Sequence, residues 1–125
     1  MQPEDISIIS EWWSRYGTPL VEDILPSVGF CVWENDELMS ACFLCTMPLR
    51  GGYGGLVSWT IVNPDHMLAG VRVVNKLLKE VVEYAKKRDF IALMGTTSSR
   101  LLAKTYLDSG FQVGDVGINQ YMIKI

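Results

Sequence analysis

The sequence predicts an α/β (α+β) domain in which a central, mixed and twisted β-sheet is flanked by about four helices. Apolar, β-branched runs alternate along the chain with segments of helical periodicity, and the segment 56–95 reads as strand, turn, long helix and strand. The chain has 125 residues, of which 49% are hydrophobic and 20% charged, which suits one buried core. We therefore expect a single domain over 1–125.

The expected order is helix, helix, strand, strand, strand, helix, strand, helix, strand, strand. The first helix, over 4–16, follows from near-helical spacing of apolar side chains and ends at Gly17 to Pro19. A short second helix over 20–25 is stopped by Pro26. The apolar face of the first helix is expected to consist of Ile6, Ile9, Trp13 and Tyr16.

Two strands, 28–34 and 38–46, flank the polar turn Asn35–Asp36 and predict a hairpin. The stretch 49–55 (LRGGYGG) is expected to be a loop that forms a mobile hairpin connection, suited to covering a substrate, and it leads to a third strand over 56–62. It lacks the Gly-Lys-Ser/Thr of a P-loop.

A long helix over 71–88 follows, then a strand over 90–95 and a helix over 99–109 that Gly110 caps. The tail 111–125 predicts two final strands. The buried face of the long helix is expected to comprise Val71, Val74, Leu78, Val81 and Ala85.

Composition excludes several classes of protein. The net charge of −3 and the pI near 5.0 argue against a broad basic surface for nucleic acid. No apolar run approaches the roughly 20 residues of a membrane-spanning helix, and the start MQPEDISII lacks the basic residues of a signal peptide. We expect a soluble, cytoplasmic protein with no membrane partner.

The three cysteines lie in strand-like sequence, at Cys31, Cys42 and Cys45. Their number and spacing do not fit a disulfide framework, and a zinc site would need more ligands than the single His66 supplies. We expect buried, small apolar residues and no metal.

The strand–helix–strand segment also predicts where a ligand binds. The first turn of the long helix carries unpaired N–H groups and the positive end of the helix dipole, and it points beyond the end of the preceding strand. Anionic cofactors bind at such places. The turn from Asn63 to Gly70 is therefore the candidate site.

The element order, with Tyr106-x3-Gly110-Phe111 near the C-terminus, resembles the GNAT superfamily of acyl-CoA-dependent N-acyltransferases over essentially the whole chain. The chain is similar to small GNAT-like proteins of bacteriophages in the pair Trp12–Trp13, the step Leu25-Pro26-x-x-Gly29 and the pair Asn63–Pro64. The resemblance implies a GNAT-like fold, acetyl-CoA as co-substrate and an amine as acceptor. It also implies a homodimer through the C-terminal strands and, for a phage protein, the host cytoplasm.

In that superfamily the turn after the central strand commonly reads Val-x-Pro-x-x-Arg/Gln-Gly-x-Gly-x-Gly/Ala and binds pyrophosphate. This chain departs from the motif at Met67, Leu68 and Arg72. The side chains that replace the glycines narrow the approach of a phosphate to the backbone. Arg72 either supplies a cation whose fork-shaped guanidinium binds phosphate or is an exposed helix residue. The resemblance assigns coenzyme binding to Ile61, Val62, Met67, Leu68, Ala69, Gly70, Val71, Arg72 and Ser99.

The second motif of the superfamily, Asn-x-x-Ala-x-x-Leu-Tyr-x-x-x-Gly-Phe, has Ser99 and Thr105 here at the Asn and Leu positions. The resemblance implies that Tyr106 is the general acid that protonates the departing thiolate. A phenol pKa near 10 suits that step. The alternative is a packed aromatic ring beside Leu102.

The amine also needs a base. Glu22 is the candidate general base, with Asp23 and His66 as alternatives, and each of them also fits a solvated surface position. A backbone N–H near Ser58 or Trp59 is the candidate donor to the thioester carbonyl.

Three functions remain open. The first is N-acetyl transfer from acetyl-CoA to an amine by direct attack in a ternary complex. The second is a catalytically degenerate GNAT-like binding or virion-associated phage protein that does not use CoA, which Met67, Leu68 and Arg72 favour. The third is modification of nucleobases or tRNA, which would need a basic groove.

Overall fold

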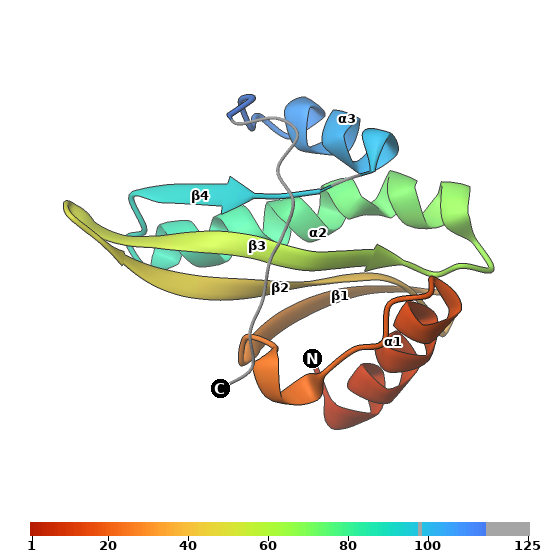
Figure 1. The fold of residues 1–125 in the computed structure, drawn as a ribbon. Coiled ribbons are helices and arrows are strands. Elements are labelled where there is room, and N and C mark those ends of the chain that lie inside the picture. Colours follow the sequence, from red (N-terminus) through yellow and green to blue (C-terminus); the bar gives the residue numbers. More distant parts are fainter. Residues whose placement is uncertain (98, 115–125) are drawn as a thin grey trace.

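The computed structural model describes residues 1–97 and 99–114, shown as a ribbon in Figure 1. The described part contains three α-helices and one four-stranded sheet. In chain order the elements are α1 (Pro3–Arg15), the 3-10 helix η1 (Glu22–Ile24), β1 (Val28–Glu34), β2 (Glu37–Leu49), β3 (Gly52–Val62), α2 (Met67–Lys87), β4 (Ala92–Gly95) and α3 (Arg100–Asp108).

The sheet has the order β1-β2-β3-β4 and is mixed, as the sequence predicts. β1, β2 and β3 pair antiparallel, whereas β3 and β4 pair parallel and are joined through α2. The β1–β2 turn places both Asn35 and Asp36 at positive φ, 50° and 62°. Two-residue hairpins favour this geometry because it matches the twist of the strands.

Helix α2 packs on one face of the sheet and supplies five of the thirteen buried residues of the core cluster there. Figure 1 shows α2 and α3 together on that face and α1 on the other. The residues that α2 buries are Gly70, Val73, Val74, Leu77, Leu78, Val81 and Ala85. The predicted face is thus confirmed, except that Val71 is only partly buried. None of the described helices is both long enough and apolar enough to cross a membrane.

Helix α1 covers the opposite face through Ile9 and Trp12, which pack with Leu38, Ala41 and Ile61. The predicted apolar face of this helix was therefore wrong in part. Adjacent helical residues point about 100° apart, so only one tryptophan of the pair is fully buried against the sheet, and it is Trp12; Trp13 is partly buried and packs against the same cluster. Tyr16 is 40% exposed.

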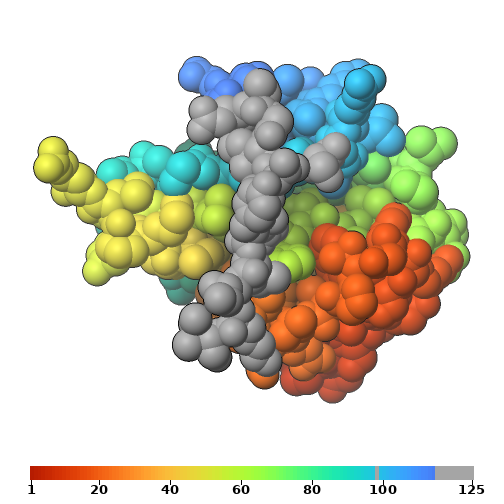
Figure 2. Space-filling view, in the orientation of Figure 1, coloured from red at the N-terminus to blue at the C-terminus, as the bar shows by residue number. Residues whose placement is uncertain are grey.

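The glycine-rich stretch is strand rather than loop. Leu49 pairs with Gly52, so only residues 50–51 turn the chain, and the resulting β2–β3 hairpin projects from the body in Figure 2. A Cβ on Gly55 would lie 2.7 Å from Cδ1 of Leu44 and 2.9 Å from Cδ2 of Leu93. The glycines here allow close packing between strands, and the expected loop over a substrate is absent from the described residues.

Other expectations need correction as well. The segment 20–25 contains only the three residues of η1, which leaves three α-helices in the described chain instead of about four. α2 begins at Met67, so the end of the expected turn is already helical. Residues 111–114 form no strand, and the rest of the two expected final strands lies outside the described residues.

The cysteines have three different environments. Cys42 is buried, Cys31 is half-buried and Cys45 is exposed, and all three thiols are free. The expectation of burial is therefore confirmed for Cys42 and wrong for Cys45, which lies where β2 leaves the core.

Candidate active site

The parallel strands β3 and β4 diverge, and this divergence creates an open strand edge inside the domain. The pairing runs from Gly54↔Ala92 to Val57↔Gly95, where β4 ends. From Ser58 to Val62, β3 pairs only with β2. The backbone groups on the far side of this segment, which we call the open edge, therefore have no described strand as partner.

A bulge lies at the start of the open edge. The register between β2 and β3 shifts between Ala41 and Phe43, and Trp59 on the opposite strand has a φ of +55°. A positive φ is rare for a bulky side chain and indicates a strained position that its surroundings hold in place. The ring of Trp59 meets that of Trp13 edge to face, with centroids 5.6 Å apart, on the α1 side of the sheet.

Tyr106 lies across the divergence on the other side of the sheet. Its hydroxyl is 3.0 Å from Oγ1 of Thr60 on the open edge. Its ring lies against Gly95, the last residue of β4, where a Cβ would be only 2.7 Å from Cε1 of Tyr106. Phe111 packs edge to face on the ring at 5.1 Å. Helix α3 thus presents the phenol at the point where the two strands separate.

The environment of Tyr106 keeps its phenol protonated. The residue is 6% exposed, and burial raises its pKa above the usual value of 10, which the contact with Thr60 partly offsets. A buried phenol with a raised pKa carries its proton throughout the neutral range. It can therefore donate that proton to a stronger base formed beside it.

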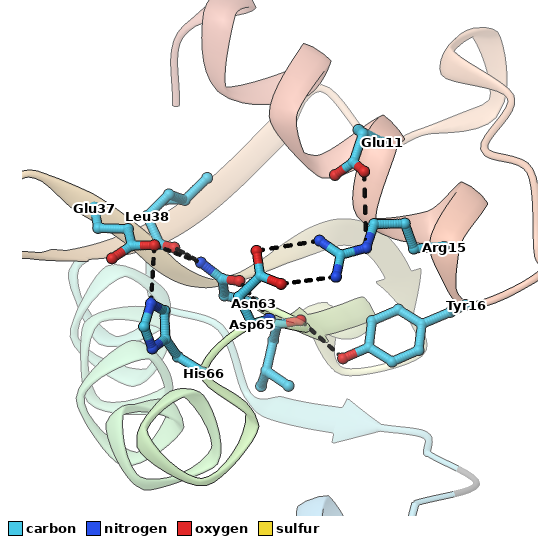
Figure 3. Close-up of polar contacts among 9 residues, drawn as sticks. Glu11, Arg15, Tyr16, Glu37, Leu38, Asn63, Asp65 and His66 are labelled. Carbon is cyan, nitrogen blue, oxygen red and sulfur yellow. Dashed lines mark hydrogen bonds and ion pairs between the residues drawn. The ribbon is translucent and has the colours of Figure 1, made fainter.

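A set of polar contacts fixes the turn between β3 and α2, as Figure 3 shows. Asn63 is buried; its amide donates to the carbonyl of Leu38 at 2.9 Å, and its Oδ1 accepts the N–H of Asp65 at 2.9 Å. Nε2 of His66 lies 3.0 Å from Oε1 of Glu37. The turn that precedes α2 is thereby tied to the start of β2.

The C-terminal end of α1 holds the same turn from the other side (Figure 3). Arg15 donates to both carboxylate oxygens of Asp65, at 2.7 and 3.2 Å, and the hydroxyl of Tyr16 donates to the carbonyl of Val62 at 3.1 Å. The backbone N–H of Asn63 donates to the carbonyl of Met39 on β2. Because the backbone groups of successive residues in a strand point to opposite sides, those of Val62 point away from β2, toward the open edge. Tyr16 therefore occupies one acceptor of that edge.

Helix α2 begins directly beyond this turn. The first bond of the helix runs from the N–H of Gly70 to the carbonyl of His66, at 2.7 Å. The N–H groups of Met67, Leu68 and Ala69 precede it and have no acceptor within the helix. A Cβ on Gly70 would lie 2.8 Å from Cβ of Val62 and 3.0 Å from the carbonyl oxygen of Met39, so glycine lets the helix start close to the sheet.

The predicted coenzyme-binding side chains are only partly gathered there. Met67 and Leu68 are 48% and 81% exposed, Val71 is partly buried, and Ile61 and Val62 are buried in the core. Ser99 is the N-cap of α3, and its Oγ accepts the N–H of Leu102 at 3.3 Å. Backbone groups, more than side chains, are thus available to a ligand at the start of α2.

Arg72 lies on another flank of α2. It lines a cavity of about 270 Å³ between α2 and the β1–β2 turn, together with Ala69, His66 and the carboxylates Glu34 and Glu37. No ion pair within the described residues includes Arg72, whereas Lys76 pairs with Glu34 at 3.2 Å. The two carboxylates make this cavity unfavourable for a phosphate.

The candidate bases lie far apart in the fold. Glu22 and its neighbour Asp23 are in η1, and Glu22 lines a cavity of about 220 Å³ on the α1 side of the sheet. His66 lies at the start of α2, bound to Glu37. The structure therefore separates Glu22 from His66 and places neither in contact with Tyr106.

Sequence reasoning missed Thr60, Arg15 and Tyr16. No pattern in the sequence distinguishes Thr60 from other strand threonines, and its role depends on the contact with Tyr106, 46 positions away. Arg15 and Tyr16 carry a weak signal, since they close the first helix just before a glycine. Their partners are again distant in the sequence.

Neither a family model nor a curated protein matches this sequence. Solved structures do match. TTHA1254 from Thermus thermophilus superposes with a TM-score of 0.76 at 15% identity, covering 100% of this chain and 95% of that one. A predicted acetyltransferase with acetyl-CoA from Clostridium acetobutylicum gives a TM-score of 0.64 at 18% identity, over 97% and 92% of the two chains.

An aminoglycoside acetyltransferase, meta-AAC0020 from an uncultured soil metagenomic sample, solved in complex with sisomicin, gives a TM-score of 0.71 at 9% identity. The match covers 98% of this chain and 90% of that one. At these identities the comparisons establish the fold alone. The described chain therefore has the GNAT-like fold of acetyltransferases, and at the level of the fold it is similar to enzymes of that type.

Proposed function

We propose that this protein is an N-acetyltransferase that transfers an acetyl group from acetyl-CoA to an amine within a ternary complex. The observation that carries the proposal is the position of Tyr106 at the divergence of β3 and β4, bonded to Thr60 on the open edge. A proton donor meets the open edge there, and the chain runs from this edge through the turn 63–66 into the start of α2. These are the parts that a thioester with an anionic tail requires.

The elements around the divergence suit the two ends of acetyl-CoA. The free N–H groups at Met67, Leu68 and Ala69 would receive the pyrophosphate, and Gly70 and Val71 follow them in the same helix. The open edge from Ser58 to Val62 would bond the extended arm as a strand does. Ser99 would lie at the start of α3 beside this arm.

The chemistry is acyl transfer. The ammonium of the acceptor gives up a proton, for which Glu22 is the proposed base, and the neutral nitrogen attacks the thioester carbon. A backbone N–H of the open edge would stabilise the developing oxyanion. The C–N bond forms and the C–S bond breaks. The nitrogen loses its second proton to water, and the departing thiolate takes the phenol proton of Tyr106. Tyr106 then regains a proton from water.

Ligand-induced stabilisation tests the proposal. At about a hundred times its dissociation constant, acetyl-CoA should stabilise the fold by roughly 2.7 kcal/mol, which raises the melting temperature by several degrees. Dephospho-CoA and free pantetheine, tested in parallel, separate binding at the helix start from binding at the open edge. A melting temperature that none of the three ligands changes would contradict the proposal.

A second function is favoured by a specific observation. The side chains at the start of α2 are apolar and exposed, Leu68 at 81%, and Arg72, about one turn further along the helix, lines a cavity with two carboxylates. A GNAT-shaped binding or virion-associated phage protein that does not use CoA would have such a surface. The same melting experiment separates the two, because this alternative predicts no shift with acetyl-CoA.

A further inference from the structure

We propose that the cavity between α1, η1 and the sheet binds the acceptor as a primary amine on a compact apolar body, whose ammonium the carboxylate of Glu22 receives. This inference rests on the proposed function, since it names the class of amine that would be acetylated. The cavity measures about 220 Å³. Its lining includes six larger side chains, Met1, Ile6, Leu25, Pro26, Phe43 and Glu22, and the small residues Ser27 and Gly29.

The walls define the chemistry of the occupant. Five of the six larger side chains are apolar, Ser27 adds a hydroxyl, and Glu22 is the one ionisable side chain among the described lining residues. An apolar cavity with one carboxylate at its rim selects a ligand that has one positive charge and an apolar body. Figure 1 shows the N-terminus beside the chain that leads from η1 into β1, where the side chain of Met1 lies over Gly29 and forms one wall of the cavity.

The cavity is connected to the open edge by one set of paired residues on adjacent strands. Gly29 of β1 pairs with Phe43 of β2, and Phe43 pairs with Ser58 of β3. Paired residues share one face of a sheet and lie on strands about 4.8 Å apart. Ser58 is the first residue of β3 beyond its last pair with β4, so the wall at Phe43 is one strand from the place where the strands separate.

The size of the cavity favours small acceptors over large ones. Pockets that enclose drug-sized ligands measure about 300–1,000 Å³, and this cavity is smaller. An aminoglycoside carries several rings and several ammonium groups, for which one carboxylate and apolar walls are a poor match. We therefore expect a small monoamine in this cavity.

Binding in the absence of acetyl-CoA tests the cavity by itself. Isothermal titration with 2-phenylethylamine, 2-phenylethanol and sisomicin compares an apolar amine, its uncharged analogue and a polycation. The amine should bind at least about fivefold tighter than the alcohol, because the charge pair with Glu22 is lost in the alcohol. Equal affinities, or tighter binding of sisomicin, would overturn the proposal.

Two variants test the named walls. Glu22→Gln should weaken the binding of 2-phenylethylamine at least about fivefold and leave the binding of 2-phenylethanol unchanged. Glu83→Gln, on the outer face of α2, should change neither affinity. Ser27→Phe adds a ring at the exposed rim of the cavity and should abolish binding of both ligands. Since Glu22 and Ser27 are exposed, both variants should fold; unchanged binding in both would refute the site.

The result also separates this inference from the proposed function. If acetyl-CoA fails to bind but the amine binds in a Glu22-dependent manner, the cavity is an amine site and the acetyltransferase proposal falls. If acetyl-CoA binds and is consumed with other amines while 2-phenylethylamine neither binds nor reacts, the inference about the cavity is wrong and the proposed function stands.

Discussion

The hydroxyl of Tyr106 lies 3.0 Å from Oγ1 of Thr60, and this contact joins α3 to the open edge of β3, which has no described strand beside it. It spans the gap that opens where β4 ends at Gly95. The phenol is therefore fixed between two strands that have separated, and neither strand offers it another described bond. This relationship is the basis for the first two predictions.

Tyr106→Phe removes the hydroxyl and keeps the ring. We expect kcat for amine acetylation to fall at least about a hundredfold, since general acid catalysis contributes that much or more. Unfolding by urea should show a loss of only about 0.5–1.5 kcal/mol, the typical value of one hydrogen bond. CoA release, followed by chromatography, measures the rate; a rate equal to that of the wild type would remove Tyr106 from the mechanism.

Gly95→Ala places a methyl group 2.7 Å from Cε1 of Tyr106 and 3.2 Å from Cζ. The ring must move, so we expect its bond to Thr60 to break and activity to fall, with a stability loss of about 1–3 kcal/mol for the crowding. Gly114→Ala is the matched control, because a Cβ there meets nothing within 4 Å. Equal activity in the two variants would show that the position of the ring is unimportant.

Asn63→Ala tests the turn before α2. The side chain of Asn63 is buried and bonds Leu38 and Asp65. Its loss removes this partner from the buried carbonyl of Leu38 and from the part-buried N–H of Asp65, which should cost about 1–3 kcal/mol. Asn75→Ala, at an exposed position with one side-chain bond to Ser109, should change stability by no more than about 0.5 kcal/mol. Urea unfolding of both variants makes the comparison.

The ion pair between Arg15 and Asp65 predicts that the stability of the fold depends on pH. The hydrogen bond from Arg15 holds the pKa of the Asp65 carboxyl below its usual value of 3.8. A lowered folded-state pKa contributes stability that is fully present above the unfolded-state value and is lost as the pH falls through the folded-state value. The difference in melting temperature between wild type and Asp65→Asn should thus be seen at pH 7 and shrink below pH 3.8.

Because this pair is exposed, added salt should reduce the same difference at pH 7. Arg15→Lys keeps the charge but loses the two-pronged contact, and it should fall between wild type and Asp65→Asn. A difference that is independent of both pH and salt would show that Asp65 acts through the backbone of the turn instead.

The three thiols should react in sequence with a disulfide reagent at pH 8. Cys45 is exposed and should react first, and Cys31, which is half-buried and whose pKa is raised by burial, should react more slowly. Burial raises the pKa of Cys42 to about 12, so it should react only on unfolding. Mass spectrometry of the labelled peptides identifies the order, and early labelling of Cys42 would contradict the described core.

The sequence determined the elements whose signals are local. The 3.6-residue period of α2, the turn at Asn35–Asp36, and the cap at Gly110, which has a φ of +96°, depend on neighbouring residues. All lie where they were predicted, except that α2 begins earlier, at Met67. The βαβ segment was predictable for the same reason, and it drew attention to the start of α2.

Only the tertiary structure decided how these parts meet. Which tryptophan of α1 faces the sheet depends on where α1 docks, and the strand character of Gly54 and Gly55 depends on neighbours that approach too closely for any Cβ. The contact of Tyr106 with Thr60 and the placement of Arg72 beside two carboxylates join residues far apart in the chain. Such contacts follow from the packing of helices on a sheet, which the local sequence does not specify.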